Sequence, residues 1–401
     1  MDLTASDITY GFEALWPDGG PRIYLDPAST NASRILTQLP VRLVGSGTEA
    51  DLLWIRKNPR EWYDKLGPFQ AINHIPSERA MIRKADLARN LHRYGDSHAQ
   101  DRFSHADFFQ PTYCLDDPQE RTAFVAQLPE VDDPGNLWIL KPSDLSSGKG
   151  VKIVWKFAWL RDALRKGGKI AFGFQGRKHE YVIQRYIKNV LLLDGKKSEI
   201  RIYWLIASLD PLLVLMYPEG TARLTMQPYK LDEFDNPLIH ITNVYQQKRH
   251  VGYNPDAVLK WGFPRFEEYL VKEKAAPGNF LEEVLRPRLR QIVAYVVRAN
   301  IESLKQTPPS GLFFGLFGAD LILDERLTPW LTEIQRGPGL SYNDSVKERV
   351  LPPMLRGAAS IMLEILALKR KGKPLAALSS THGYDWVIRD PATEGKQQPA
   401  H

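Results

Sequence analysis

Two apolar runs separated by a short polar turn constrain the fold of this chain more than any other segment. Residues 316–335 read LFGADLILDERLTPWLTEIQ, with the turn-like stretch 324–328 between the runs. This arrangement predicts a β-hairpin. If the hairpin is symmetric, Asp320 lies opposite Glu333, and Gln335 shares the face of Glu333 because side chains alternate along a strand.

The predicted pairing of two carboxylates has a chemical consequence. Like charges directly opposed on a sheet are destabilising, and burial makes that cost larger. A divalent cation between them would reverse the effect, and oxygen ligands suit Mg²⁺. The sequence therefore makes Asp320, Glu333 and Gln335 candidate magnesium ligands. The alternative is that one carboxylate simply points to solvent.

A second strand pattern carries a row of charges. Residues 195–206 read GKKSEIRIYWLI, and their alternation puts apolar side chains on one face. The other face carries Lys197, Glu199, Arg201 and Tyr203. Such a face is either an outer surface in contact with water or the wall of an anion site. Arg223, in EGTARLTMQPY, adds a further cation near the strands that follow.

A loop of small residues follows a predicted buried strand at 137–140. The loop contains SSGKG, residues 146–150, with Lys141 before it and a second apolar strand at 151–155 after it, so we predict a hairpin. Small residues let backbone N–H groups approach a phosphate, and Lys149 would neutralise charge there. The segment lacks the G-x-x-x-x-G-K-[ST] pattern, and a plain turn is the alternative.

Two shorter segments complete the set of candidate binding residues. Gln184, Arg185, Tyr186 and Ile187 end an apolar strand and would offer main-chain groups to a nucleobase. His240, Ile241, Thr242 and Asn243 follow an acidic loop. The chain has no G-x-S-x-G, H-E-x-x-H or G-x-G-x-x-G pattern, so nothing predicts a serine hydrolase, a zinc protease or a dinucleotide-binding fold.

Composition limits the class of protein. A chain of 401 residues suits two or three lobes packed together. Cys114 is the only cysteine, which excludes an intrachain disulfide and favours a reducing compartment. We expect a cytoplasmic protein with no membrane partner, because we find no secretory signal and the unbroken apolar runs are short. The net charge of +6 fits an anionic ligand or partner without demanding nucleic acid.

The pattern of apolar residues predicts further elements. Helices are expected at 78–91, 157–166, 289–301 and 354–368, and strands at 181–187, 200–209 and 212–217, with a turn at Pro211. We divide the chain into a small N-terminal α/β lobe (1–72), a central lobe (73–183), a C-terminal lobe (184–378) and a polar tail (379–401).

Taken in order, these fragments resemble the tubulin tyrosine ligase-like family of ATP-grasp enzymes. The resemblance runs from about Asn73 to Leu368, through NHIPSERAMIRKADLARNL, KPSDLSSGKGV, VIQRYIKNVLLLDGKKSEIRIYWLIASLDPL, EGTARLTMQPY with HITN, and LFGADLILDERLTPWLTEIQRGPGLS. It implies an α+β ATP-grasp fold, in which two lobes clasp ATP beside the N-terminal lobe. It also implies an ATP-dependent ligase that joins an amino acid to a carboxylate of a protein or peptide through an acyl phosphate.

The resemblance implies roles for individual residues. Lys84 and Lys141 would contact or support the phosphates, and residues 184–187 would line the adenine pocket. His240, Thr242 and Asn243 would lie near the ribose and phosphates, and Asp320, Glu333 and Gln335 would hold Mg²⁺. The side chains facing both nucleotide and acyl substrate would be Lys197, Glu199, Arg201 and Arg223, of which Arg201 and Arg223, with Glu333, would be catalytic.

Three positions depart from the family pattern. Gln335 stands where the family usually has Asn, Glu199 where it has Asp, and Ser147 where a basic residue often precedes the loop glycine. The expected partners are a free amino acid (Tyr, Glu or Gly) and an acidic acceptor such as a tubulin tail. The segment from Arg223 to Asn243 looks most like the tyrosine-adding or glycine-adding branches. The alternatives are a nucleotide-binding pseudoenzyme that scaffolds acidic tails, an ATP-grasp ligase for a small metabolite, and a basic nucleic-acid module.

Overall fold

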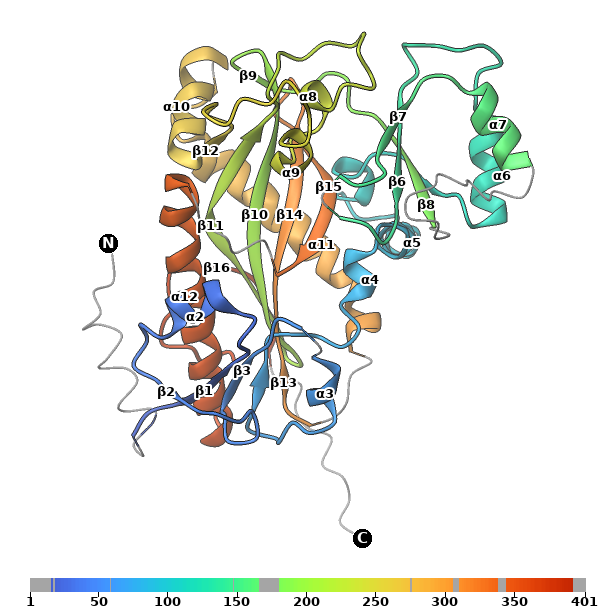
Figure 1. The fold of residues 1–401 in the computed structure, drawn as a ribbon. Helices are drawn as coiled ribbons and strands as arrows, with labels where there is room; N and C mark the ends of the chain where they lie inside the picture. The colour runs from blue at the N-terminus through green and yellow to red at the C-terminus, as the bar shows by residue number, and fades with distance from the viewer. Residues whose placement is uncertain are drawn as a thin grey trace.

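The computed structural model describes residues 16, 19–57, 59–146, 148–165, 180–274, 276–305, 310–337 and 344–391. Helices pack around and between three separate β-sheets in this part of the chain (Figure 1). The arrangement is a mixed helix-and-sheet fold, consistent with the predicted α+β class.

The first sheet is built mainly from the N-terminal residues. Its strands are all parallel, in the order β13-β4-β3-β1-β2. The bounds are β1 (Arg22–Leu25), β2 (Arg42–Leu43), β3 (Leu52–Trp54), β4 (Ala71–Ile72) and β13 (Leu312–Phe313), and the helices beside them are α2 (Thr30–Leu36) and α3 (Arg60–Tyr63). Since β13 comes from far along the chain, the N-terminal sheet is tied directly to the segment that enters the predicted hairpin.

The second sheet, called the main sheet below, has seven antiparallel strands. Its central order is β12-β11-β10-β14-β15, with β16 on β11 and β9 on β10. The bounds are β9 (Leu192–Leu193), β10 (Lys196–Leu209), β11 (Leu212–Leu224), β12 (Lys260–Gly262), β14 (Gly315–Leu323), β15 (Pro329–Arg336) and β16 (Asp385–Arg389). Strands predicted at 200–209 and 212–217 and the turn at Pro211 are therefore confirmed, as is the hairpin β14–β15.

Helices cover both faces of the main sheet. They are α10 (Phe263–Lys274), α11 (Arg286–Leu304), preceded by a π-helical turn η2 (Leu281–Leu285), and α12 (Ser345–Arg370). Alternation divides β10 between two cores: Ile202 and Trp204 pack with the α11 side, whereas Tyr203 and Leu205 pack with α12. Helices α11 and α12 confirm the two core helices expected from apolar spacing.

The third sheet has four antiparallel strands in the order β5-β8-β6-β7. Its elements are β5 (Thr112–Cys114), α6 (Pro118–Ala126), β6 (Trp138–Pro142), β7 (Lys152–Val154), α7 (Ala158–Arg165) and β8 (Tyr181–Arg185). Helices α6 and α7 cover its outer face around Phe124 and Phe157 (Figure 1). The predicted hairpin around the small-residue loop is confirmed by the β6–β7 pairing.

The basic helix predicted at 78–91 is two helices. They are α4 (Arg79–Ile82) and α5 (Lys84–Ser97), broken where Arg83 is extended. The main-chain N–H of Lys84 donates to the Ser143 carbonyl and that of Ala85 to the Ser143 hydroxyl. The first donors of α5 are thus satisfied by the third sheet, which fixes where Lys84 lies. The remaining short helices are η1 (His105–Asp107), α8 (Pro237–His240) and α9 (Val244–Gln247).

Two of the proposed boundaries do not match the elements. The division at 183/184 cuts β8, which belongs as a whole to the third sheet. Residues 385–389, assigned to a polar tail, form β16 instead, because Trp386 and Ile388 find partners on the edge of β11. Residues 392–401 lie outside the described part of the chain.

Helix α12 qualifies the expectation about membrane spans. By length and composition it is apolar enough to cross a bilayer, but 83% of its apolar window is buried inside the protein. A search for unbroken apolar runs does not find α12, because Ser360 and Glu364 interrupt the apolar residues of this helix. Both side chains are buried, and the burial of the helix accounts for its hydropathy without a membrane.

Candidate functional site

Adjacent strands of the main sheet bring the predicted charged residues together. Arg201 on β10 lies opposite Asp320 on β14, and Asp320 lies opposite Glu333 on β15. On the other side of β10, Glu199 lies opposite Arg223 on β11. The predicted opposition of Asp320 and Glu333 is confirmed, and the charged face of β10 is an inner wall: Lys197 is 3% exposed and Arg201 7%.

A β-bulge sets this register. Leu321 pairs with Leu331 and Asp320 with Glu333, so Thr332 is an extra residue on β15. Without the bulge, Asp320 would face Thr332 instead of Glu333. The Thr332 hydroxyl is within hydrogen-bond distance of the Asp320 main-chain oxygen (2.9 Å) and of Glu199 Oε1 (2.7 Å). Thr332 therefore links three strands at the site, and nothing in the sequence pattern singled it out.

Asp320 is neutralised by arginines. Arg201 Nη2 donates to Asp320 Oδ2 at 2.8 Å, its Nε donates to Oδ1, and Arg223 Nη2 lies 2.5 Å from Oδ1. Burial alone raises the pKa of Asp320, but the two guanidinium groups outweigh it and hold that pKa at about 2. Cationic side chains therefore already relieve the repulsion between the opposed carboxylates. The pairing is then not by itself evidence for a metal, and the magnesium assignment stays a prediction.

Glu333 and Gln335 are held more loosely. Lys84 Nζ lies 3.5 Å from Glu333 Oε1, and the Glu333 side chain is 18% exposed. Gln335 directs its amide nitrogen to Asp320 Oδ2 at 3.3 Å. Among the described residues, no group of three or more His, Cys, Asp or Glu side chains is arranged to hold a metal ion. Two carboxylates and one amide are what this corner provides.

Two buried lysines come from different sheets. Lys141 Nζ, on β6, donates to Gln184 Oε1 at 2.7 Å and to the Thr332 carbonyl at 3.3 Å. Lys197 Nζ, on β10, donates to the Tyr186 hydroxyl at 3.0 Å. Burial lowers the pKa of Lys141 to about 8, helped by the nearby Lys84, and burial lowers the pKa of Lys197 to about 7 against the attraction of Glu199.

The segment 240–243 closes one end of this group. Thr242 donates its hydroxyl to Glu199 Oε2. His240 Nδ1 lies 3.0 Å from the Tyr186 hydroxyl, and burial, with Lys197 nearby, lowers the pKa of His240 to about 4. Asn243 caps α9 by accepting from the Tyr245 N–H. These contacts make His240 a neutral part of the wall.

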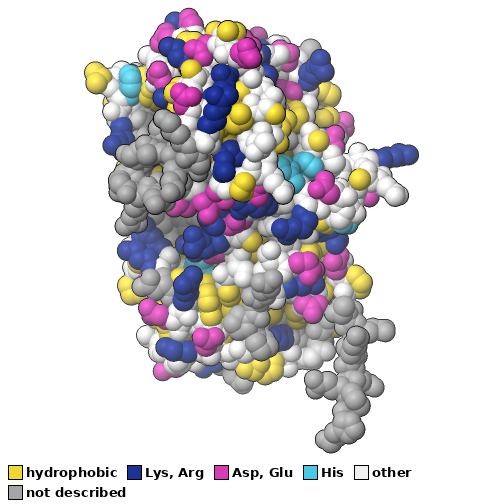
Figure 2. Space-filling view, turned by 90° about the vertical axis from the view of Figure 1, so that its right-hand side faces the viewer, with side chains coloured by type: hydrophobic (Ala, Val, Ile, Leu, Met, Phe, Trp, Pro, Cys, Tyr) yellow, Lys and Arg dark blue, Asp and Glu magenta, His cyan; other side chains and the backbone are white. Residues whose placement is uncertain are grey.

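Three adjoining pockets form what we call the central cleft, between the third sheet and the main sheet. Their volumes are about 110, 240 and 440 Å³, and neighbouring pockets share lining residues, among them Lys84 and Glu333. Predicted residues that line the cleft are Lys84, Lys141, Lys197, Glu199, Arg223, His240, Thr242, Asn243, Asp320, Glu333 and Gln335. Figure 2 shows basic and acidic side chains gathered in a band across the middle of one face of the molecule.

Other predicted residues are not in the cleft wall. Gln184 and Tyr186 stand behind the two lysines that they contact, and Arg185 lies over the Trp138 ring at 5.2 Å. Lys149 lies 5.8 Å from the Tyr245 ring centre. Ile187 and Arg201 do not line these pockets either, and Arg201, predicted to face the nucleotide, stands behind Asp320, to which it donates. Ser147 lies outside the described residues.

The small-residue loop reaches the cleft through its glycines. Gly148 and Gly150 line it and both have φ of +69°. A side chain at Gly150 would also place a Cβ 2.8 Å from Pro142 Cγ, so glycine is required there.

Sequence reasoning missed Arg79 and Arg83, which line the largest of the three pockets. Their signal was the basic character of the helix containing Lys84.

Arg223 has hydrogen-bonding capacity to spare. The side chain lines the cleft, and its buried Nε has no hydrogen-bond partner in the part of the chain that the structure describes, whereas its Nη2 lies 2.5 Å from Asp320 Oδ1 and 3.3 Å from Glu199 Oε2. A buried donor without a partner is costly. An anion in the cleft would satisfy it, and guanidinium suits phosphate and carboxylate.

Comparison with known proteins bears on this site directly. The family model described as "Tubulin-tyrosine ligase family" matches residues 63–369, which include every cleft residue named above. The chain belongs to the tubulin-tyrosine ligase family. The predicted family resemblance is confirmed, and membership assigns the chain to the ligase class of enzymes.

Curated relatives within the tubulin-tyrosine ligase family are mostly polyglutamylases by name. The chain is 27% identical over 387 residues to the probable tubulin polyglutamylase ttll-9 of Caenorhabditis elegans, covering 92% of this chain and 85% of that one. It is 32% identical over 300 residues to the probable tubulin polyglutamylase TTLL2 of Mus musculus, covering 73% and 50%. It is also 30% identical over 289 residues to the protein polyglycylase TTLL10 of Macaca fascicularis, covering 68% and 45%.

Proposed function

We propose that the chain is an ATP-dependent ligase of the ATP-grasp type that joins an amino acid to a carboxylate of an acidic protein or peptide. The observation that carries this proposal is the set of cations that meet in the central cleft. Lys84, Lys141, Lys197 and Arg223 all line it, against the three carboxylates of Glu199, Asp320 and Glu333, and Arg223 Nε has no hydrogen-bond partner among the described residues. Cations that outnumber the carboxylates beside them in a poorly hydrated cleft are unfavourable unless an anion joins them, and a triphosphate supplies that charge.

The roles of the residues follow from their positions. The lysines and Arg223 would hold phosphate oxygens by charge-assisted hydrogen bonds. The apolar side chains of Ile139, Val151 and Ile241 in the adjoining pockets fit a nucleobase. A role for the main chain of residues 184–187 at the adenine stays a prediction.

The oxygen donors of the cleft fit a magnesium ion in chemistry. Glu333 is partly exposed, with Lys84 as its ion-pair partner, while Asp320 shares its oxygens with two guanidinium groups. We therefore propose Glu333 as the principal ligand, with Asp320 and Gln335 beside it. When bound, the ion would neutralise charge on phosphate oxygens.

The proposed reaction has two steps. An oxygen of the acceptor carboxylate attacks the γ-phosphorus of ATP, the bond to ADP breaks, and an acyl phosphate forms. The amine nitrogen of the incoming amino acid then attacks the acyl carbon, the carbon–oxygen bond breaks, and phosphate leaves while the amine loses a proton. Catalysis of this kind depends on positioning and charge stabilisation, which the cations from Lys84 to Arg223 would provide.

The acceptor and donor follow from the chemistry and from the relatives. A protein with net charge +6 suits an acidic acceptor, and the relatives named above are polyglutamylases and a polyglycylase. Those names favour glutamate or glycine over tyrosine as the added amino acid, and tubulin as the acceptor to test first. A cytoplasmic location stays a prediction from composition.

Mass spectrometry of an acceptor tests the proposal. The chain is incubated with ATP, Mg²⁺, a mixture of amino acids and tubulin or a synthetic acidic tail. We expect a mass increase that identifies the donor, a fragment spectrum that locates the bond, and phosphate release in step with it. Nucleotide binding without product on any acceptor, and without phosphate release above background, would instead favour a binding scaffold.

We expect ATP binding to take up protons at mildly alkaline pH. The pKa values of Lys197 and Lys141 are lowered to about 7 and about 8, so both lose charge in the free protein as pH rises. Bound phosphates would raise both pKa values. Proton uptake is then expected between about pH 7 and 9, and ATP affinity falls as pH rises through that range.

Titration calorimetry in buffers of different ionisation enthalpy measures that uptake. Lys197→Met should reduce it, and Lys248→Met, at an exposed position, should not. An uptake of zero throughout this pH range would contradict the placement of phosphates beside the two lysines.

A further inference from the structure

A second pocket lies where the N-terminal sheet meets the main sheet. It has a volume of about 330 Å³ and is lined by residues of the N-terminal sheet and by Leu316, Arg336 and Gly337 from the hairpin. We call it the junction pocket. Arg336 and Gly337 also line the central cleft, so the two spaces are neighbours across the end of β15. Its volume is within the range of small-molecule and peptide side-chain sites.

Ser29 is the first sign that the junction pocket binds something. Its side chain is 5% exposed, lines the pocket, and its hydroxyl has no hydrogen-bond partner among the described residues. Ser29 stands at the N-cap of α2, where a serine hydroxyl normally accepts from the first turn, but it makes no such bond. An unsatisfied buried hydroxyl requires an explanation, and a ligand in the pocket is one.

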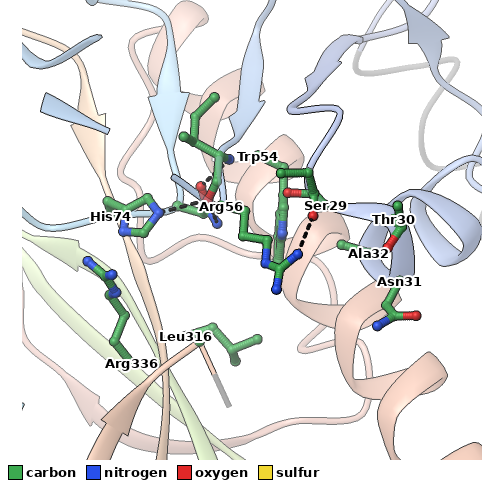
Figure 3. A pocket seen from close by; sticks show the side chains of 13 residues that line it. Ser29, Thr30, Asn31, Ala32, Trp54, Arg56, His74, Leu316 and Arg336 are labelled. Atoms are coloured by element: carbon green, nitrogen blue, oxygen red, sulfur yellow. Dashed lines mark hydrogen bonds between the residues drawn. The ribbon is translucent and has the colours of Figure 1, made fainter. Parts of the chain in front are cut away.

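Cationic side chains face the same space. Figure 3 shows Arg56 reaching into the pocket from the Ser29 side and Arg336 on the opposite side, with His74 nearby. Arg56 Nη1 donates to the Ala28 carbonyl at 2.8 Å, which holds the side chain in place through one of its nitrogens. Arg336 Nη1 donates to Glu78 at 2.7 Å, but its side chain remains 42% exposed.

The balance of charge favours an anion in the junction pocket. Glu78 is 3% exposed and neutralises part of the charge of Arg336, and the same carboxylate lies 3.3 Å from His74 Nδ1. Arg56 is exposed and lines the pocket without an ion-pair partner in the described part of the chain. With the Ser29 hydroxyl, the free donors face a space to which no carboxylate contributes a lining side chain. A carboxylate accepting from a hydroxyl and a guanidinium matches this set.

We propose that the junction pocket holds a carboxylate side chain of the acceptor peptide next to the residue being modified. This inference rests on the proposed function, since it names the place where the acidic acceptor lies. A peptide in the pocket would pass Arg336 and Gly337 to bring its neighbouring carboxylate into the central cleft near Glu333. Arg56 and Ser29 would then determine affinity for acidic acceptors without touching the reacting atoms.

Binding of a fluorescein-labelled oligoglutamate peptide to the full chain tests the proposal. Fluorescence anisotropy is measured without ATP, so that the result does not depend on catalysis. Arg56→Gln is expected to weaken binding about tenfold, the loss of one hydrogen bond to a charged group. Ser29→Ala is expected to weaken it about threefold, with no loss of stability because the hydroxyl makes no bond in the free protein. Arg42→Gln, an exposed arginine of the same sheet outside the pocket, is the matched control and should bind as wild type does.

The outcomes separate this inference from the proposed function. If ligation occurs but Arg56→Gln leaves both peptide affinity and the acceptor KM unchanged, the junction pocket is not the acceptor site. If free glutamate displaces the labelled peptide as effectively as unlabelled peptide does, the pocket is a site for the donor amino acid and the proposal is overturned. Loss of peptide binding in Arg56→Gln without any ligation would uphold the pocket and count against the proposed function. ATP affinity should be the same in all three variants.

Discussion

Replacing Glu333 by glutamine is expected to lower the rate of ligation by about 100-fold or more, while ATP still binds. The substitution keeps the size of the side chain and removes the negative charge of Glu333, which at 18% exposed is more accessible than the other proposed carboxylate ligand, Asp320, at 5%. A divalent ion that neutralises the transferred phosphate would lose its main ligand. Phosphate release and product formation measure the rate, and titration calorimetry measures nucleotide affinity.

The matched control for this prediction is Glu302→Gln. Glu302 is an exposed residue of α11 outside the cleft pockets, so its substitution should leave rate and affinity unchanged. A Glu333→Gln variant that turns over at the wild-type rate would remove Glu333 from the metal assignment. A variant that is slow because it has unfolded is recognised by a lowered melting temperature, which this isosteric change at a partly exposed position should not cause.

Replacing Asp320 by asparagine is expected to lower the free energy of unfolding by about 3–5 kcal/mol. Asp320 is 3% exposed and pairs with Arg201, which is 7% exposed, and with Arg223. Removing one partner of a buried ion pair leaves the other charge uncompensated, and here two guanidinium groups lose their shared carboxylate. Urea denaturation at neutral pH measures the loss, and Asp256→Asn, at an exposed position, is the matched control.

The effect of Asp320→Asn depends on pH in a defined direction. The pKa of Asp320 is lowered from 3.8 to about 2, so its carboxylate contributes stability above about pH 4 and loses it as the pH falls toward 2. The difference in the free energy of unfolding between wild type and variant should therefore be constant near neutral pH and become smaller below about pH 4. A loss below about 1 kcal/mol at neutral pH would mean that water or another side chain replaces the carboxylate.

Much of the candidate site follows from local patterns in the chain. Alternation on β10 puts Lys197, Glu199 and Arg201 on one face because successive side chains of any strand point to opposite sides. The hairpin itself is predictable from its two apolar runs, but pairing by distance from the turn alone would put Asp320 opposite Thr332, and the bulge brings Glu333 there instead. These regularities act between residues close in sequence, so the sequence contains the information needed to see them.

Other features depend on contacts between distant segments. The helix predicted at 78–91 breaks at Arg83 because Ser143 satisfies the first donors of α5. The bulge at Thr332 is needed for the predicted register, yet threonine is an ordinary strand residue. Residues 385–389 are a polar tail by composition, but they form a strand because they pair with β11. In each case a partner more than fifty positions away, or one on another strand, decides the local structure.

The sequence by itself determined the family, the main strands and core helices, and the set of charged residues that share a face, because these depend on residue type and spacing. Only the tertiary structure decided which charges neutralise one another. Arg201 and Arg223 reach Asp320 because β10, β11 and β14 are neighbours in the main sheet, and burial then makes that pairing strong. The junction pocket likewise exists only because β13 joins the N-terminal sheet and places the end of β15 beside Ser29 and Arg56.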